Sequence, residues 1–335
     1  MNGRLENEIK KEQALLNKLN TMPDYVSEWY FNLKASNKTI TTCKDYIYKI
    51  DKFLSFVEES VGNKQLGNIS LPIVQRYFIS IQKKDVNGTI VYTSDSYQQT
   101  IWCCLNSFFE FLVETEKMSK NYMKMISKPK NKDLERINAN RVLLTKKDFN
   151  KILKSVENGV GSKRAKSFQE NQRSRDRAIM LLFMTTGLRK SALSEININD
   201  IDLIMGTLHV VDKGNKYHSY ILSEKTIEAL NEWIYDRQEW DVKSDALFIS
   251  DTGNRISATA LSELVDKYCK DALGTHISPH KLRAGFCSIL YKETGNAEFV
   301  RRAVGHSNIA TTQRYIVTDN NERAKASELI DGLLH

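Results

Sequence analysis

The sequence predicts a mainly α-helical protein with a small β-hairpin, divided into two domains. Its 335 residues are enough for two separate cores. Apolar residues recur at three- and four-residue steps, as at Ile50, Phe53 and Val57, which is the spacing of a helix that buries one face. Around Gly214-Asn215 the pattern indicates a hairpin instead, and a lysine-rich stretch at 117–136 separates the two halves of the chain.

The composition is that of a soluble globular protein, with 27% charged and 41% hydrophobic residues. The net charge of +8 favours a polyanionic partner. The five cysteines are odd in number and lack paired-ligand spacing, so we expect reduced thiols and a cytoplasmic location. No apolar run is long enough to span a membrane and no signal-peptide core is present, so we expect neither a membrane protein nor a secreted one.

Residues 1–21 and 22–118 are both predicted to be helical. The first segment carries apolar residues at helical spacing and reads as a peripheral N-terminal helix, with a small contact to DNA or to a partner subunit as the alternative. The second reads as an all-α domain, with helices near 71–82 and 94–116 on either side of a loop at Asn87-Gly88.

Residues 119–141 form the predicted linker between the domains. Lysines are frequent there, and Pro129 interrupts any helix. An extended basic linker that follows a phosphate backbone is one interpretation, and a merely solvated linker is the other. In the first case Lys128, Lys130 and Lys132 contact DNA.

Residues 142–321 are predicted to form the second domain. Its apolar run at 178–184 predicts a buried helix that ends near Gly187 and brings Arg189 beside the core. The polar segment before it, residues 158–172, reads as a loop. Two more helices are expected near 224–235 and 258–270.

A hairpin is expected between these helices. Its strands are 207–211 and 217–222, and its turn carries Lys213 and Lys216. Either lysine could reach DNA from the turn, although lysines in turns are common surface residues.

The last segment, residues 322–335, is amphipathic and too short to be stable alone. It either covers its own domain or packs on a neighbouring subunit.

The strongest chemical signal lies at 278–283. Ser278 suits the N-cap and Pro279 the first position of a helix. His280 and Arg283 then share one face of its first turn, beside backbone N–H groups and the positive end of the helix dipole. Such a surface suits an oxyanion or a phosphate.

A second signal follows at 305–315. Gly305 permits a tight turn before His306, and Tyr315 would lie two turns along the next helix. A tyrosine can act as a covalent nucleophile when cations stabilise its oxyanion. Taken singly, each of these residues is more often ordinary surface or packing, but their combination is not.

The set Gly187-Leu188-Arg189, His280-x-x-Arg283 and Gly305-His306 with Tyr315 resembles the motifs of the tyrosine recombinases, the phage integrase family. The resemblance covers roughly residues 22–325. It implies a two-domain DNA clamp, in which an all-α, SAM-like core-binding domain joins an α+β catalytic domain. It also implies site-specific cleavage and rejoining of DNA through a 3′-phosphotyrosyl intermediate and a Holliday junction.

The resemblance implies six catalytic residues: Arg189, Lys213, His280, Arg283, His306 and Tyr315. The arginines and His306 would bind the non-bridging phosphate oxygens. Lys213 would protonate the leaving 5′ oxygen, with Lys216 as its alternative, and Tyr315 would form the ester. These positive side chains supply the charge, so neither a metal nor another cofactor is expected.

The resemblance also implies the partners. These are double-stranded recombination sites and three further copies of the chain, forming a tetramer with exchanged C-terminal tails. The helical face with Lys38, Thr41 and Lys44 is a candidate DNA surface of the first domain; a solvated helix start is the alternative. Two other functions remain open: a type IB topoisomerase, and a DNA-binding protein with a degenerate site.

The sequence departs from the family pattern at three places. Ala192 replaces a usually acidic residue, Ala284-Gly285 replaces a small polar or histidine pair, and 217–220 lacks the usual basic residue and proline. None of these changes removes a predicted catalytic group. They concern the support of Arg189 and Lys213.

Overall fold

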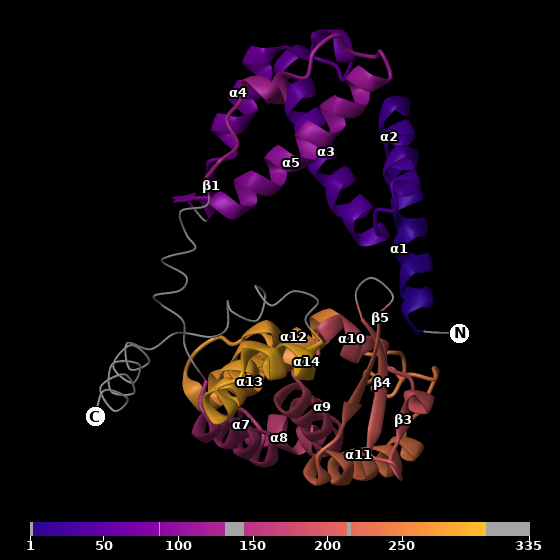
Figure 1. Cartoon of the computed structure of the whole chain (residues 1–335), viewed down its shortest axis with the longest axis vertical. Coiled ribbons are helices and arrows are strands. Elements are labelled where there is room, and N and C mark those ends of the chain that lie inside the picture. Colours follow the sequence, from indigo (N-terminus) through magenta and orange to yellow (C-terminus); the bar gives the residue numbers. More distant parts are fainter. Residues whose placement is uncertain (1–2, 87, 131–143, 213–215, 306–335) are drawn as a thin grey trace, which may run out of the picture. The chain divides into compact units, whose positions relative to one another are not determined.

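The computed structural model describes residues 3–86, 88–130, 144–212 and 216–305. It divides into two compact units, Gly3–Arg141 and Val142–His335 (Figure 1). Both are mainly helical, and the second contains a small antiparallel sheet, so the predicted fold class is confirmed. No helix in the described ranges has the length and apolar character needed to cross a membrane.

The first unit is built from helices around an aromatic core. Trp29 and Phe108 meet edge to face, with ring centroids 5.0 Å apart, and Phe53 and Phe109 extend the cluster. Its helices are α1 (Gly3–Leu19), α2 (Asp24–Ala35), α3 (Ile40–Val61), α4 (Leu71–Ser80) and α5 (Asp95–Glu114), with the short 3₁₀ helices η1 (Leu66–Asn68) and η2 (Tyr122–Met125).

The expected peripheral helix is instead part of this core. Leu15 of α1 is fully buried and Leu19 nearly so, and α1 packs on α3. Leu5 and Ile9 of the same helix are exposed, although they follow the same helical spacing as the buried Leu15 and Leu19. The spacing alone therefore did not reveal how much of the helix is buried.

The expected loop at Asn87-Gly88 lies between the two strands of a small hairpin. Strands β1 (Lys83–Val86) and β2 (Thr89–Tyr92) pair in antiparallel register on either side of it. The turn signal was therefore right and the strands were missed. The β2 side chains are all exposed, so no alternation of apolar and polar residues marked the strand.

The lysine-rich segment is attached to the first unit as far as Lys130. Met123 is fully buried in the core, the Trp102 indole donates to the Ile126 carbonyl at 2.8 Å, and Gln99 donates to the Pro129 carbonyl at 2.6 Å. An extended linker therefore does not begin at 119.

The second unit surrounds one buried helix, α9 (Arg173–Thr186), which packs against α7, α11 and α13 (Figure 1). The other helices are α7 (Lys146–Asn158), α8 (Lys163–Glu170), α10 (Lys190–Glu195), α11 (Glu224–Asp236), α12 (Ala258–Leu273), α13 (Pro279–Thr294) and α14 (Ala297–Val304), with the 3₁₀ helices η3 (Ile198–Asp200) and η4 (Arg237–Glu239). The strands are β3 (Ile201–Asp202), β4 (Thr207–Asp212) and β5 (Lys216–Ile221), in the antiparallel order β3-β4-β5.

Helix α8 corrects the expectation of a loop over 158–172. Ser162 caps it by accepting from the Ala165 N–H at 3.3 Å. None of its residues is buried, so it lacks the apolar face by which a helix is recognised in sequence.

Candidate active site

Arg283 is the most firmly held of the predicted site residues. It lies in the first turns of α13, where Ser278 caps the helix by accepting from the Lys281 N–H at 3.3 Å, as expected. Its side chain is 2% exposed. One terminal nitrogen donates to the Val304 carbonyl at 2.8 Å, and the other donates to the Gly187 carbonyl.

Both carbonyls stand at helix C-termini. Gly187 is the C-cap of α9, and Val304 is the last residue of α14. Helix C-termini carry partial negative charge and unsatisfied carbonyls, so they attract a guanidinium. Arg283 therefore joins the ends of two helices to the start of a third.

Gly187 allows this close junction. Its φ of +63° is left-handed, and a Cβ atom there would lie 2.7 Å from the Phe286 ring and 3.3 Å from Val304. A larger residue would separate α9 from α13 and α14. The predicted glycine at the end of the buried helix is thus confirmed, and its second role in packing comes from the tertiary structure.

Arg189 lies two residues after Gly187 and is the N-cap of α10. It is half-buried. Because Arg283 bonds to the Gly187 carbonyl, the two predicted arginines lie at the same corner of the second unit. His280 is exposed in the first turn of α13, one turn before Arg283.

Three predicted catalytic residues, Lys213, His306 and Tyr315, lie outside the described residues, as does Lys132. The structure does define where two of these segments begin. Asp212 pairs with Lys216 at the end of the β4–β5 hairpin, and α14 ends at Gly305, directly before His306. For Lys216 only the backbone is described.

Two departures from the family pattern are explained by packing. Ala192 is 5% exposed in the core of the second unit. A Cβ atom at Gly285 would lie 2.8 Å from the Cβ of Leu144, so α13 and Leu144 approach too closely for a larger residue. Burial also raises the pKa of the Cys287 thiol, two residues further along α13, to about 11, so this group stays neutral near the arginine.

The candidate DNA contacts of the first unit are available at its surface. Lys38 and Thr41 are exposed around the start of α3, and Lys44 lies 5.7 Å from the Tyr48 ring centroid. Further along the chain, Lys130 is exposed, and Lys128 is exposed over Trp102, 5.8 Å from its ring centroid.

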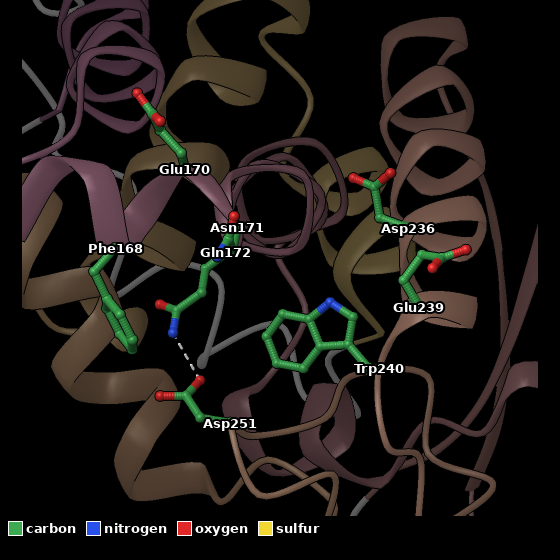
Figure 2. A pocket seen from close by; sticks show the side chains of 8 residues that line it. All are labelled: Phe168, Glu170, Asn171, Gln172, Asp236, Glu239, Trp240 and Asp251. Atoms are coloured by element: carbon green, nitrogen blue, oxygen red, sulfur yellow. Dashed lines mark hydrogen bonds between the residues drawn. The ribbon is translucent and has the colours of Figure 1, made fainter.

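A pocket of about 580 Å³ in the second unit has a different chemistry. Figure 2 shows Trp240 and Phe168 on its walls and a hydrogen bond of 2.7 Å from Gln172 to Asp251. Its remaining lining residues include Glu170, Asp236 and Glu239, with Asn171. Four carboxylates repel a phosphate, so this pocket is not the site of a DNA backbone.

Sequence reasoning missed one residue beside the predicted site, His218 of β5. A Cβ atom at Gly305 would lie 2.6 Å from its imidazole ring. This contact joins parts of the chain that are distant in sequence. The one signal in the sequence was that β5, which carries His218, departs from the family pattern.

Comparison with known proteins identifies the family of the chain. The model of the phage integrase family matches residues 142–322. The tyrosine recombinase XerC of Actinobacillus pleuropneumoniae is 32% identical over 222 residues, which cover 66% of this chain and 67% of XerC. XerC of Proteus mirabilis is 36% identical over 153 residues, covering 45% and 50%.

Solved structures show the same fold. The XerH site-specific recombinase bound to a palindromic difH substrate has a TM-score of 0.67 at 22% identity, covering 96% of this chain and 89% of XerH. A lambda integrase dimer bound to a COC′ core site has a TM-score of 0.61 at 16% identity, covering 86% and 96%. The chain therefore belongs to the phage integrase family, and its function is that of a site-specific tyrosine recombinase.

Proposed function

We propose that Arg189, Lys213, His280, Arg283, His306 and Tyr315 form the catalytic site of this recombinase. The observation that carries the proposal is the position of Arg283, whose guanidinium donates hydrogen bonds to the carbonyls of Gly187 and Val304. These carbonyls lie two residues before Arg189 and two residues before His306. Arg283 thus contacts the backbone two residues before each of the other predicted phosphate ligands, which supports the proposal.

The chemistry follows from what a phosphodiester needs. The Tyr315 oxygen forms a bond to phosphorus while the bond from phosphorus to the 5′ oxygen breaks. Arg189, Arg283 and His306 stabilise the charge that grows on the non-bridging oxygens. Lys213 gives its proton to the 5′ oxygen, and His280 assists removal of the proton from Tyr315.

Rejoining is the reverse of this step. A 5′ hydroxyl attacks the phosphotyrosyl ester and Tyr315 leaves. The ester conserves the energy of the broken bond, so no nucleotide is consumed. Exchange between two DNA sites proceeds through a Holliday junction.

For the domains, we propose a core-binding domain that takes in the predicted helix at 1–21 and extends from the predicted range 22–118 to Lys130, a linker over the remainder of the predicted segment 119–141, a catalytic domain at 142–321 and a tail at 322–335. The two larger domains would act as a clamp around DNA. The proposed contacts outside the catalytic site are Lys38, Thr41, Lys44, Lys128, Lys130, Lys132 and Lys216. The exposure of Lys38, Thr41, Lys128 and Lys130 supports this role.

For the assembly, we propose a homo-tetramer on two double-stranded recombination sites. Exchange of the tails at 322–335 would link the protomers. The lambda integrase structure is that of a dimer on a core site, which supports assembly on DNA without fixing the number of copies.

The test is covalent trapping. A bound sequence is first selected from a pool of random DNA duplexes, and a copy with a nick close to each candidate scissile phosphate is then incubated with the protein in EDTA. The native protein should form an adduct that survives denaturing gels and is lost in Tyr315→Phe, which should still shift the DNA in a native gel. An adduct that persists in Tyr315→Phe would contradict the assignment, and cleavage only with a divalent ion would indicate a metal nuclease.

A further inference from the structure

We infer that His218 is a positioning residue of the recombinase site, which holds the turn at Gly305 against the β4–β5 hairpin. The inference rests on the proposed function, because it concerns the support of the same catalytic residues. It names a residue that the resemblance to the family does not supply, since β5 departs from the family pattern at this point.

The contact is unusually close. A Cβ atom at Gly305 would lie 2.6 Å from Cε1 and from Nε2 of His218 and 3.0 Å from its Cδ2. The outer edge of the imidazole therefore lies directly over the Gly305 backbone. Gly305 also has a φ of +68°, so both the space and the backbone conformation require glycine.

The alternation of β5 explains why His218 faces this turn. Tyr217, Ser219 and Ile221 are exposed, whereas His218 is half-buried and Tyr220 is 7% exposed. Side chains of a strand alternate between its two faces. His218 and Tyr220 therefore share the inner face of the hairpin, with their ring centroids 6.3 Å apart.

The turn is held from two sides. The Val304 carbonyl accepts from Arg283 at 2.8 Å, and the next residue, Gly305, is covered by the ring of His218. The residue after that is His306. The backbone at the end of α14 is thus held by Arg283 and His218 together.

His218 also lies on the strand that leads back to the segment of the predicted lysine. It pairs with Val210, and the register continues through Val211 and Tyr217 to Asp212 and Lys216, on either side of residues 213–215. The end of a two-stranded hairpin has little support of its own. A side chain packed between the hairpin and Gly305 ties together the described ends of the two segments that continue into Lys213 and His306.

Catalytic rates depend steeply on such placement, since a displacement of about 1 Å can slow a reaction about 100-fold. Initial DNA affinity depends on many phosphate contacts and should be less sensitive. His218→Ala should therefore reduce the single-turnover rate of adduct formation on the nicked duplex about 10- to 100-fold. Its dissociation constant for DNA should stay within about twofold.

His209→Ala is the matched control. His209 is an exposed histidine on the neighbouring strand β4, where its Nδ1 lies 2.9 Å from the Ser219 hydroxyl on the outer face. This variant should keep both the rate and the affinity of the native protein. A native rate in His218→Ala, or an equal loss in both variants, would overturn the inference.

A thermodynamic cycle tests the contact without catalysis. Gly305→Ala should lower the melting temperature strongly, because the new methyl group meets the imidazole. In the His218→Ala background the same change should lower it less, because only the backbone strain remains. If the changes in melting temperature of the two single variants simply add in the double variant, His218 and Gly305 are not in contact. A different outcome separates the inference from the proposed function. If the native protein itself forms no adduct but the cycle shows coupling, the proposed function is wrong and the contact between His218 and Gly305 is still supported.

Discussion

At the scale of single residues, Arg283 donates hydrogen bonds to two backbone carbonyls. The contacts to Gly187 and Val304 fix the plane of the guanidinium, and a planar fork can meet two acceptors at once. The arginine therefore serves the junction of three helices as well as the proposed phosphate site.

Arg283→Lys should lose both functions although it keeps the charge. One ammonium group cannot reach two separate carbonyls, and a buried carbonyl without its donor destabilises a protein by about 1–3 kcal/mol. We expect that loss in urea unfolding, together with a strong loss of adduct formation. Arg302→Lys is the control, because that side chain is 76% exposed and its pair with Glu298 lies at the surface. Native stability in Arg283→Lys would show that the carbonyl contacts contribute little.

Which site residues could be predicted depends on how local their signals are. The Ser278 cap and the Gly187 terminus are encoded within a few residues, and both are confirmed. Arg189 and Arg283 were recognised through motifs, and their proximity needed the tertiary structure. The contact of His218 could not be predicted, because the departure of its strand from the family pattern does not reveal that Gly305 lies against its ring.

At the scale of elements, α9 ends beside the proposed catalytic site, at Gly187, and begins at a buried ionic cluster. Asp176 is fully buried, accepts from the Tyr268 hydroxyl at 2.7 Å and from Arg175 at 3.0 Å, and lies 3.4 Å from Lys267. Burial lowers the pKa of Lys267 and raises that of Tyr268. The cluster thus fastens the start of α9 to α12.

Asp176→Ala should remove this attachment and take from the buried Arg175 its buried carboxylate partner, leaving the partly exposed Asp251. Breaking a buried pair in this way destabilises a protein by about 3–5 kcal/mol. Arg177→Ala on the same helix breaks only a partly exposed pair with Glu232 and should change stability by about 0–1 kcal/mol. Chemical denaturation of both variants checks this, and equal effects would mean that burial of the cluster is unimportant.

Helix α14 should depend on pH through Glu298. Hydrogen bonds from Arg301 and then Arg302 lower the pKa of this carboxyl from 4.5 to about 2. A lowered pKa in the folded state means that the stabilisation is fully present above about pH 4.5 and is lost as the pH falls toward 2. Carboxyl chemical shifts should report a midpoint near 2, and the protection factors of the α14 amides, which correct for the intrinsic pH dependence of exchange, should fall below pH 4.5. In Glu298→Gln that fall should be absent, and an ordinary midpoint in the native protein would contradict the pairing.

Elements with a buried face could be predicted, and elements without one could not. The apolar run at 178–184 correctly indicated α9, and the alternation around the Gly214-Asn215 turn correctly indicated β4 and β5. Helix α8 and strand β2 have no buried side chains, so they left no periodic signal. Their formation depends on caps and turns, which are weaker signals.

At the scale of the whole molecule, the lysine-rich break correctly indicated two separate cores but not where the first core ends. Met123 and Trp102 attach the segment up to Lys130 to the first unit. Single apolar residues between lysines do not form a periodic pattern, so the sequence suggested a longer linker than the structure has. The candidate contacts Lys128 and Lys130 therefore belong to a segment with a fixed backbone, so less backbone conformational entropy is lost when DNA binds.

The tail at 322–335 provides the last prediction, at the level of the assembly. It lies outside the described residues, and its sequence places Leu329, Ile330 and Leu333 on one side of a short helix. Burying a few such side chains is worth on the order of several kcal/mol before the cost of ordering. If the tail docks on a neighbouring protomer, the copies on two DNA sites are linked into a closed ring.

Removal of 322–335 should therefore weaken assembly more than first contact with DNA. Single-site band shifts should be largely unchanged, whereas recombination between two sites should fall. Because Tyr315 lies just upstream, docking of the tail would also set the position of the nucleophile, so adduct formation should fall as well. A full-length variant with Leu329 and Leu333 changed to Ser tests the apolar face without shortening the chain and should reproduce the truncation. If both proteins recombine as well as the native chain, the tail only covers its own domain.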